Sequence, residues 1–264
     1  MTKSSSLSWP AIARGAGGVI VLLAIWEGFA RSGLFSTALT PPLGTIVRTF
    51  WSMIADGTLL LHAGATMLRL FAGLAIALAI ALPLALLMGR YPWCERLLRP
   101  MLNVLMPIPS LAWVPLVVLW FGIGDLSTVL IVVYAASFPL LYNVWTGVRA
   151  INPIWTRAAV AMGASESSLF RHVMLPAALP YVITGVRLAF GRGWIAVIGG
   201  ELLASPEWGL GKVIFDAKEY LNADVMLAAL LAVGVLGLFF ERFVFQRLEA
   251  ATIGRWGMAT VTRR

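Results

Sequence analysis

The chain has 264 residues, of which 60% are hydrophobic and 12% are charged. Soluble domains contain about 25% charged residues, so this composition indicates a membrane protein rather than a soluble domain. The formal net charge is +8, but the basic residues are scattered rather than clustered, which argues against binding to nucleic acid.

A helix needs about 20 apolar residues to cross the hydrocarbon layer of a membrane. Because an unpaired backbone group is costly in lipid and the apolar runs are continuous rather than alternating, we expect helices and not strands. The predicted fold is an all-α membrane protein with a single transmembrane domain, residues 1–264. Its six predicted spans are residues 13–30, 67–88, 101–121, 127–148, 179–203 and 225–245.

The N-terminus carries Lys3 and Arg14 before the first span, which resembles the basic start of a signal peptide. No small-x-small cleavage site follows the apolar stretch, so we predict a retained first helix. If the N-terminus is in the cytoplasm, Lys and Arg are concentrated in the inside segments, with Arg255, Arg263 and Arg264 among them. The positive-inside rule therefore predicts that both termini face the cytoplasm.

Two outside segments are predicted to contain short helices. Apolar residues between Val47 and Ile54 recur at helical spacing, as in a helix that lies at the membrane interface. Residues 205–224 combine acidic and aromatic side chains. We expect this second segment to form a short helix on the outer face and to contribute to a docking surface.

Prolines interrupt the third predicted span at Pro107, Pro109 and Pro115. Each removes a helical hydrogen bond and favours a kink or unwound backbone. Irregular backbone at membrane depth is tolerated where it lines a cavity or packs within protein. These three prolines are therefore candidates for the wall of a transport pathway.

The fifth predicted span contains two arginines, Arg187 and Arg192. An arginine near mid-membrane is costly unless it faces protein, water or a counter-ion. Glu201 is about 13 Å from Arg192 along the helix, too far for an intrahelical pair. Arg192 therefore either faces the pathway and attracts an anion or pairs with a carboxylate on another helix. Arg187 lies nearer the cytoplasmic end, and we expect it to be structural.

Motifs for ATP binding, metal binding and covalent catalysis are absent from the sequence. GLGK at residues 209–212 lacks the spacing of a phosphate-binding loop, and His62 and His172 are too far apart to suggest a metal site. Nothing resembles a nucleophile elbow, and the single cysteine, Cys94, cannot form an intrachain disulfide. We therefore expect no catalytic residue, no metal site and no cofactor bound by this chain.

Carboxylates in the spans offer no evident site for ion coupling. Glu27, Glu201 and Glu241 all lie near the ends of predicted spans, whereas proton-coupled carriers usually place carboxylates deep inside theirs. This argues against a secondary carrier.

Residues 153–178 form a polar, arginine-bearing segment between two long apolar segments. Pro153 can occupy the first turn of a helix, and Gly163 can end that helix in a left-handed conformation. Ser165 is then the predicted N-cap of a second helix, with Glu166 near its positive end. We predict two short helices at an angle, closed by Leu175-Pro176.

An apolar stripe follows the predicted cap, at Leu169, Phe170, Val173 and Met174. Such a stripe can either pack under the chain's own helix bundle or fill a cleft on another protein. The pattern of residues alone leaves both interpretations open.

The segment resembles the EAA signature of permease subunits of binding-protein-dependent ABC importers, through Ala158-Ala159-x3-Gly163-x9-Val173-x-Leu175-Pro176. Arg157 departs from the signature, which usually has glutamate there, and Val173 replaces the usual isoleucine. Residues 106–125, 175–203 and 209–231 resemble the nitrate/sulfonate/taurine branch of that family. The resemblance covers about residues 39–248.

The resemblance implies a type I ABC importer permease, a multi-pass protein of the bacterial cytoplasmic (inner) membrane. Two copies would form the pore within the lipid, and they are expected to be identical because one permease per system is usual in this branch. Two separate ATPase subunits would hold ATP and Mg, and a periplasmic or lipid-anchored binding protein would deliver a small anion such as a sulfonate, taurine or nitrate. The alternatives are an ATP-independent secondary carrier or channel and a membrane-embedded enzyme.

In that family the loop between the fourth and fifth spans forms a coupling helix that contacts the ATPase. Gly163 would set its bend, and Leu169 and Phe170 would fill a socket on the ATPase. The residues that the resemblance assigns to this coupling are Arg157, Ala158, Ala159, Gly163, Ala164, Ser165, Glu166, Leu169, Phe170, Arg171, Leu175 and Pro176.

Overall fold

The computed structural model describes residues 9–204 and 206–252, with the backbone alone at 9–16, 250 and 251. Lys3, Ser205, Arg255, Arg263 and Arg264, which the sequence analysis used, lie outside the described residues. All regular structure in the described part is helical, as predicted. The helices and their bounds are α1 (Trp9–Arg31), α2 (Leu43–Ala55), α3 (Thr58–Arg90), α4 (Pro92–Leu105), η1 (Ser110–Trp113), α5 (Val114–Phe121), α6 (Asp125–Arg149), α7 (Pro153–Ala161), α8 (Glu166–Leu169), η2 (Phe170–Met174), α9 (Leu175–Ala204), α10 (Leu210–Glu219), α11 (Ala223–Phe239), η3 (Phe240–Phe245) and α12 (Gln246–Thr252).

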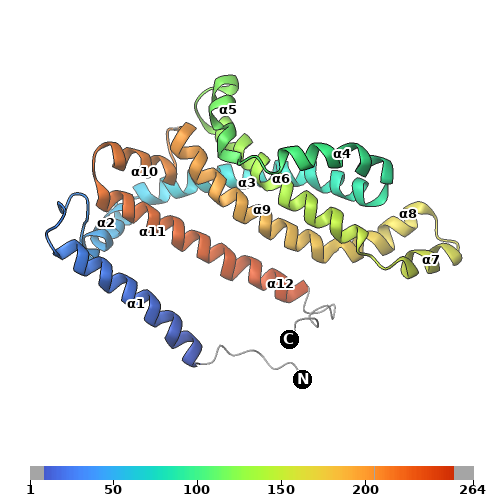
Figure 1. Ribbon diagram of the computed structural model, residues 1–264, viewed down its shortest axis with the longest axis horizontal. Helices are drawn as coiled ribbons and strands as arrows, with labels where there is room; N and C mark the ends of the chain where they lie inside the picture. The colour runs from blue at the N-terminus through green and yellow to red at the C-terminus, as the bar shows by residue number, and fades with distance from the viewer. Residues whose placement is uncertain (1–8, 205, 253–264) are drawn as a thin grey trace.

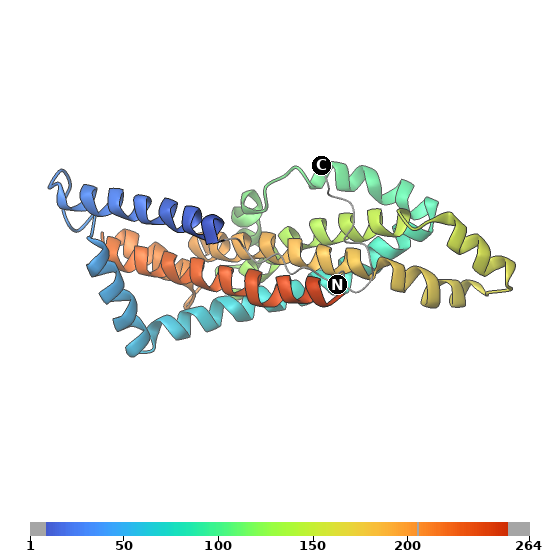
Figure 2. The ribbon, with the colours of Figure 1, turned by 90° about the horizontal axis from the view of Figure 1, so that it is seen from below.

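The long helices run along the length of an elongated bundle (Figure 1). Helices α2 and α10 lie at one end of the bundle, and α7 and α8 lie at the other, as the view from below also shows (Figure 2). The two short helices predicted outside the spans are confirmed as α2 and α10. The segment that contains α10 and the segment that contains α7 and α8 therefore lie at opposite ends of the bundle.

Four continuous helical segments of the described chain are long and apolar enough to cross a membrane, or five if α4 and η1–α5 count as one bent span. The four are α3, α6, residues 166–204 and residues 223–249. Helix α1 covers the first predicted span. The second span is predicted to start at residue 67, but α3, which contains it, already begins at Thr58.

The third predicted span, residues 101–121, is broken at Pro107 and Pro109, which confirms the interruption predicted from these prolines, whereas Pro115 lies in the first turn of α5 and breaks no helix. Helix α4 begins at Pro92 and ends at Leu105, and the following helices turn away from it by 84°. Pro107 and Pro109 lie in the break, where each lacks the N–H that would continue the helix. The carbonyl oxygen of Leu105 accepts from the Ile108 N–H at 3.1 Å and from the hydroxyl of Tyr134 at 2.7 Å, so α6 helps to satisfy the broken helix end.

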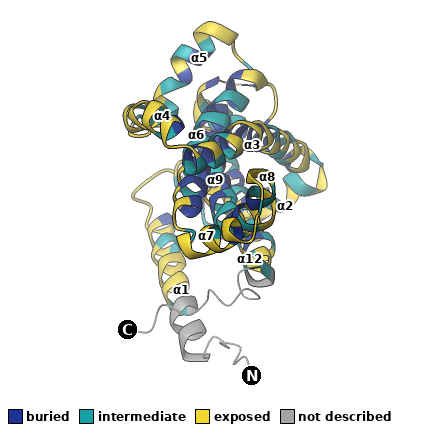
Figure 3. Cartoon of the chain, turned by 90° about the vertical axis from the view of Figure 1, so that its right-hand side faces the viewer, coloured by how far each residue is buried: buried dark blue, intermediate teal, exposed yellow. Residues whose placement is uncertain are grey.

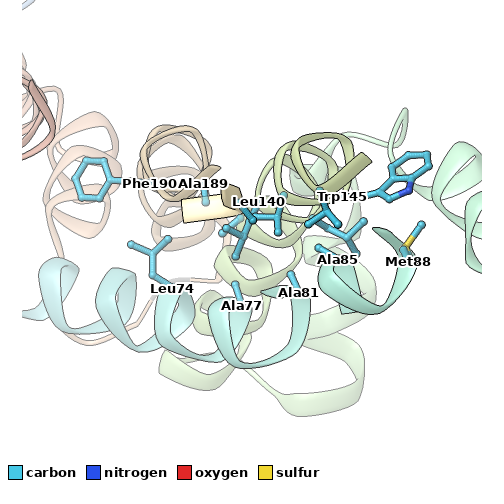
Figure 4. Packing of buried hydrophobic residues seen from close by; sticks show 14 of the residues in the cluster. Leu74, Ala77, Ala81, Ala85, Met88, Leu140, Trp145, Ala189 and Phe190 are labelled. Atoms are coloured by element: carbon cyan, nitrogen blue, oxygen red, sulfur yellow. The ribbon is translucent and has the colours of Figure 1, made fainter. Parts of the chain in front are cut away.

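The core lies where α6 packs against both α3 and α9. Ala77, Ala81 and Ala85 recur every fourth residue on one side of α3 and are almost fully buried. Figure 4 shows this side of α3 turned toward Leu140 of α6. Small residues on one face let two helices approach closely. Gly199 of α9 has the same effect, because a Cβ there would lie 2.6 Å from the side chain of Leu111.

The outer surface of the bundle is largely apolar. Helix α1 is mostly exposed (Figure 3), and Leu22 and Ile25 each expose 68% of their surface. Side chains of this kind are stable against lipid or a partner subunit but not against water. The surface is therefore consistent with a membrane-embedded subunit.

Candidate coupling segment and translocation cavity

The polar segment begins with a capped helix, α7. Pro153 is its first residue, as predicted, and the side chain of Asn152 accepts a hydrogen bond from the Ile154 N–H at 2.9 Å. Gly163 has φ +83°, which confirms the predicted left-handed residue after this helix. Ser165 caps α8, as predicted, through its hydroxyl oxygen, which accepts from the Ser168 N–H at 3.3 Å.

Helix α8 continues directly into the span α9, which corrects the prediction that Leu175-Pro176 closes the unit. The π-helical turn η2 joins them, and the whole helical segment runs for 39 residues from Glu166 to Ala204. A π-turn shifts the hydrogen-bond pattern by one residue, so the missing N–H of Pro176 does not break the helix. At 1.5 Å per residue this segment is about 58 Å long.

The apolar stripe of the segment faces the chain's own bundle. Leu169 and Met174 are each only 7% exposed, and Phe170 packs against the main core. The prediction that Leu169 and Phe170 fill a socket on another protein is therefore wrong for Leu169. The apolar side chains that remain outside are on α7 and its end, where Val160 is 58% and Met162 is 82% exposed.

The predicted coupling residues differ in how far they are exposed. Arg157, Ala158, Gly163, Ser165, Glu166, Arg171, Leu175 and Pro176 are exposed, Ala164 and Phe170 are half-buried, and Ala159 and Leu169 are buried. Glu166 pairs with Arg90 at the end of α3, with Oε1 and Nη2 3.1 Å apart. Arg157 has no acidic partner in the described chain and donates weakly to the Pro153 carbonyl at 3.4 Å.

A groove of about 640 Å³ runs between α7 and the η2–α9 junction. Trp155 and Met162 line it from the α7 side, and Val173 and Pro176 line it from the other side. Its walls are mainly apolar. The polar segment therefore presents both a projecting side chain, Met162, and a concave surface beside it.

A second cavity, of about 360 Å³, lies at the break between α4 and η1. Pro107 and Pro109 line it together with Tyr134 of α6 and Arg192 of α9. The structure thus brings together three of the four predicted pathway residues. Pro115 does not line this cavity and lies in the first turn of α5.

Arg192 also lines a cavity of about 400 Å³ beside Arg187 and Glu241. Its side chain is exposed, and no carboxylate of the described chain pairs with it. Arg187, by contrast, forms ion pairs with both Glu241 and Glu249, which hold its side chain in place. These ion pairs agree with the structural role expected for Arg187, whereas Arg192 makes no ion pair within the described chain.

Replacing Arg187 with Met is expected to destabilise the subunit by about 1–3 kcal/mol, because Glu241 and Glu249 would lose their shared partner in a partly buried site. Thermal unfolding of the detergent-solubilised protein measures this. Arg247→Met is the matched control, since Arg247 has no carboxylate partner among the described residues. Equal melting temperatures for Arg187→Met and the unchanged protein would contradict the assignment.

Comparisons with known proteins agree with this architecture. Residues 77–246 match the family of the binding-protein-dependent transport system inner membrane component. The taurine transport system permease protein TauC of Escherichia coli is 32% identical over 230 residues, which are 85% of this chain and 83% of that protein. The bicarbonate transport system permease protein CmpB of Synechococcus elongatus is 31% identical over 249 residues, 90% of this chain and 87% of that protein.

Other relatives extend the same picture. The putative aliphatic sulfonates transport permease protein SsuC of Escherichia coli is 35% identical over 216 residues, 82% of each chain. A chain of the inward-facing MetNI methionine ABC transporter has TM-score 0.60 at 22% identity, covering 80% of this chain and 97% of that one, so the two share a fold. On this family match and these identities, the chain belongs to the inner membrane components of binding-protein-dependent transport systems, the permease subunits of ABC importers.

Proposed function

We propose that this chain is the pore subunit of an ATP-driven importer that moves a small anion, of the sulfonate, taurine or bicarbonate class, inward by alternating access. The observation that carries the proposal is Arg192, an arginine without a carboxylate partner at a cavity in the broken span. The solutes in the names of the relatives, taurine, aliphatic sulfonates and bicarbonate, each contain a small anionic group.

The chemistry of the cavity supports an anionic substrate. A guanidinium presents a planar fork of N–H donors that matches the oxygens of a sulfonate or carboxylate. Ser110 and Tyr134 add hydroxyl groups to the same lining. A cavity of about 360 Å³ is within the range that small molecules occupy in proteins.

The polar segment supports coupling to a motor protein. Met162 and Val160 project from the end of the bundle at which α7 and α8 lie (Figure 1). Two ATPase subunits bind there, one for each copy of this chain in a homodimeric pore, and ATP and Mg are bound by those subunits alone. Both termini face the cytoplasm, and a binding protein docks at the opposite end, over α10.

Co-purification tests this assembly. The tagged chain is co-expressed with its cognate ATPase subunit and extracted in mild detergent. It is expected to retain one ATPase subunit for each copy of the chain. The secondary carrier or channel predicts the opposite result, a chain that purifies alone and transports its anion without ATP.

A further inference from the structure

A buried carboxylate, Glu201, lies at the end of α9 farthest from the coupling segment. Its side chain is completely buried. Oε1 accepts a hydrogen bond from Arg69 Nη1 at 2.6 Å, and Oε2 accepts from the Thr66 hydroxyl at 3.0 Å. Both partners are on α3, so Glu201 joins the ends of two spans.

The same carboxylate holds the start of helix α10. Its Oε2 accepts from the Gly211 N–H at 2.8 Å, and the Thr66 hydroxyl oxygen accepts from the Leu210 N–H at 2.9 Å. The N–H groups at a helix start have no partner within the helix and attract negative charge. Side chains of α3 and α9 therefore take the place of the usual cap.

The glycines at this junction are needed for the close approach. A Cβ at Gly209 would lie 2.5 Å from Cδ of Glu201, and one at Gly211 would lie 2.6 Å from its Cβ. Gly209 also has φ +150°, which other residues rarely adopt. The backbone at the start of α10 is therefore in direct contact with the Glu201 side chain.

Arg69 extends the cluster to a fourth element. Its Nη2 lies 2.7 Å from Oδ1 of Asp125, the first residue of α6. The Asp125 side chain is exposed, whereas the Arg69–Glu201 pair is buried, and removing either member of that buried pair leaves an uncompensated charge, which is strongly unfavourable. The starts or ends of α3, α6, α9 and α10 are consequently fixed to one another at a single point.

Ion pairs link α3 to the α8–α9 segment at both ends. Arg90 of α3 pairs with Glu166 beside the coupling segment, and Arg69 of α3 pairs with Glu201 at the far end. Because α8 and α9 form one continuous helical segment, the two helices are tied together along their length. Helix α10 is attached to the same pair.

We propose that Glu201 is a positioning residue that fixes α10 to α3 and α9, so that a movement begun at the coupling segment carries α10 with it. The inference rests on the proposed function, in which α8 lies beside the ATPase and α10 faces the binding protein. Tyr220 and Leu221, at the end of α10, are 76% and 64% exposed and are available to such a partner.

Spin-label distances test the attachment. In the complex with the ATPase and with Cys94 replaced by Ala, labels on Cys introduced at Leu60 of α3 and Tyr220 of α10 are expected to give one narrow distance within each copy of the chain, and complexes that carry only one of the two labels identify distances between copies. That distance should be the same without nucleotide and with ATP trapped. Glu201→Gln, and the paired change Arg69→Met with Glu201→Met, which keeps the buried volume filled, should both broaden it.

Glu207→Gln is the matched control, because Glu207 is exposed in the same connection and the change is chemically identical. It should keep the narrow distance. The stimulation of ATP hydrolysis by the substrate-loaded binding protein should fall about tenfold in the Glu201 variants, a size typical of coupling between distant sites, while basal hydrolysis is kept.

Two results would overturn the inference: an unchanged distance distribution in both Glu201 variants, or unchanged stimulation by the binding protein. Neither would touch the proposed function, since the unaltered complex would still assemble and hydrolyse ATP. If the unaltered chain instead failed to retain the ATPase or to respond to the binding protein, the proposed function itself would fail.

Discussion

Arg192→Gln is expected to reduce ATP-driven uptake of the anion bound by the cognate binding protein at least about tenfold in proteoliposomes, which corresponds to about 1.4 kcal/mol of lost attraction. The reason is electrostatic. In the described chain no carboxylate neutralises Arg192, and its side chain lines the cavity at the helix break. A positive charge that no carboxylate neutralises attracts an anion that enters the cavity.

The controls for this change separate charge from structure. Arg192→Lys keeps the positive charge and should retain much more uptake than Arg192→Gln, although it lacks the planar fork of donors. Co-purification of the ATPase should be unchanged in both variants, because Arg192 lies far along α9 from the coupling segment. Unaltered uptake by Arg192→Gln would remove Arg192 from the pathway.

Met162→Asp is expected to abolish co-purification of the ATPase without lowering the melting temperature of the subunit. Met162 is 82% exposed, so replacing its side chain removes few contacts within the subunit and changes its free energy of unfolding little. A carboxylate that must be buried without a partner in an apolar contact costs several kcal/mol, which is enough to dissociate most complexes. Affinity chromatography on the tagged chain and thermal unfolding measure the two effects.

Two further variants serve as controls for Met162→Asp. Leu39→Asp makes the same kind of change at a side chain that is 51% exposed near the opposite end of the bundle, and it should leave the ATPase bound. Leu169→Ala should instead destabilise the segment itself by about 2–4 kcal/mol, because Leu169 is buried within the chain. Retention of the ATPase by Met162→Asp would place the contact elsewhere.

Local signals in the sequence predicted the coupling segment well. Pro153, Gly163 and Ser165 each act within a few residues of themselves, through a first turn, a left-handed backbone and a cap, so no distant contact was needed to recognise them. The direction of the apolar stripe could not be predicted in the same way. A stripe shows which side of a helix is apolar but not which partner covers it, and Leu169 is covered by the chain's own bundle.

Contacts between distant segments explain the remaining differences. Hydropathy averaged over a window shows residues 101–121 as one span, whereas Pro107 and Pro109 break it and Tyr134 satisfies the broken end. The partner of Glu201 is Arg69, far away in the sequence, so its role in holding α10 required the structure. The continuity of α8 with α9 was hidden by Pro176, which usually indicates a helix boundary.

Arg157 remains the clearest departure from the family signature. The residue is exposed on α7, and within the described chain it makes no ion pair. The usual glutamate at this position would pair with a basic residue on the ATPase, whereas this arginine would pair with an acidic one. We therefore expect an acidic residue on the cognate ATPase opposite Arg157.

The central claim is that this chain transports its solute only when the ATPase and the binding protein act with it. Uptake of the radiolabelled anion that the cognate binding protein binds, measured in proteoliposomes that contain the reconstituted complex, tests it most directly. The account predicts uptake that requires ATP, the binding protein and both membrane and ATPase subunits, and that stops when ATP is replaced by a non-hydrolysable analogue. Equal uptake by the chain alone, without ATP, would contradict it.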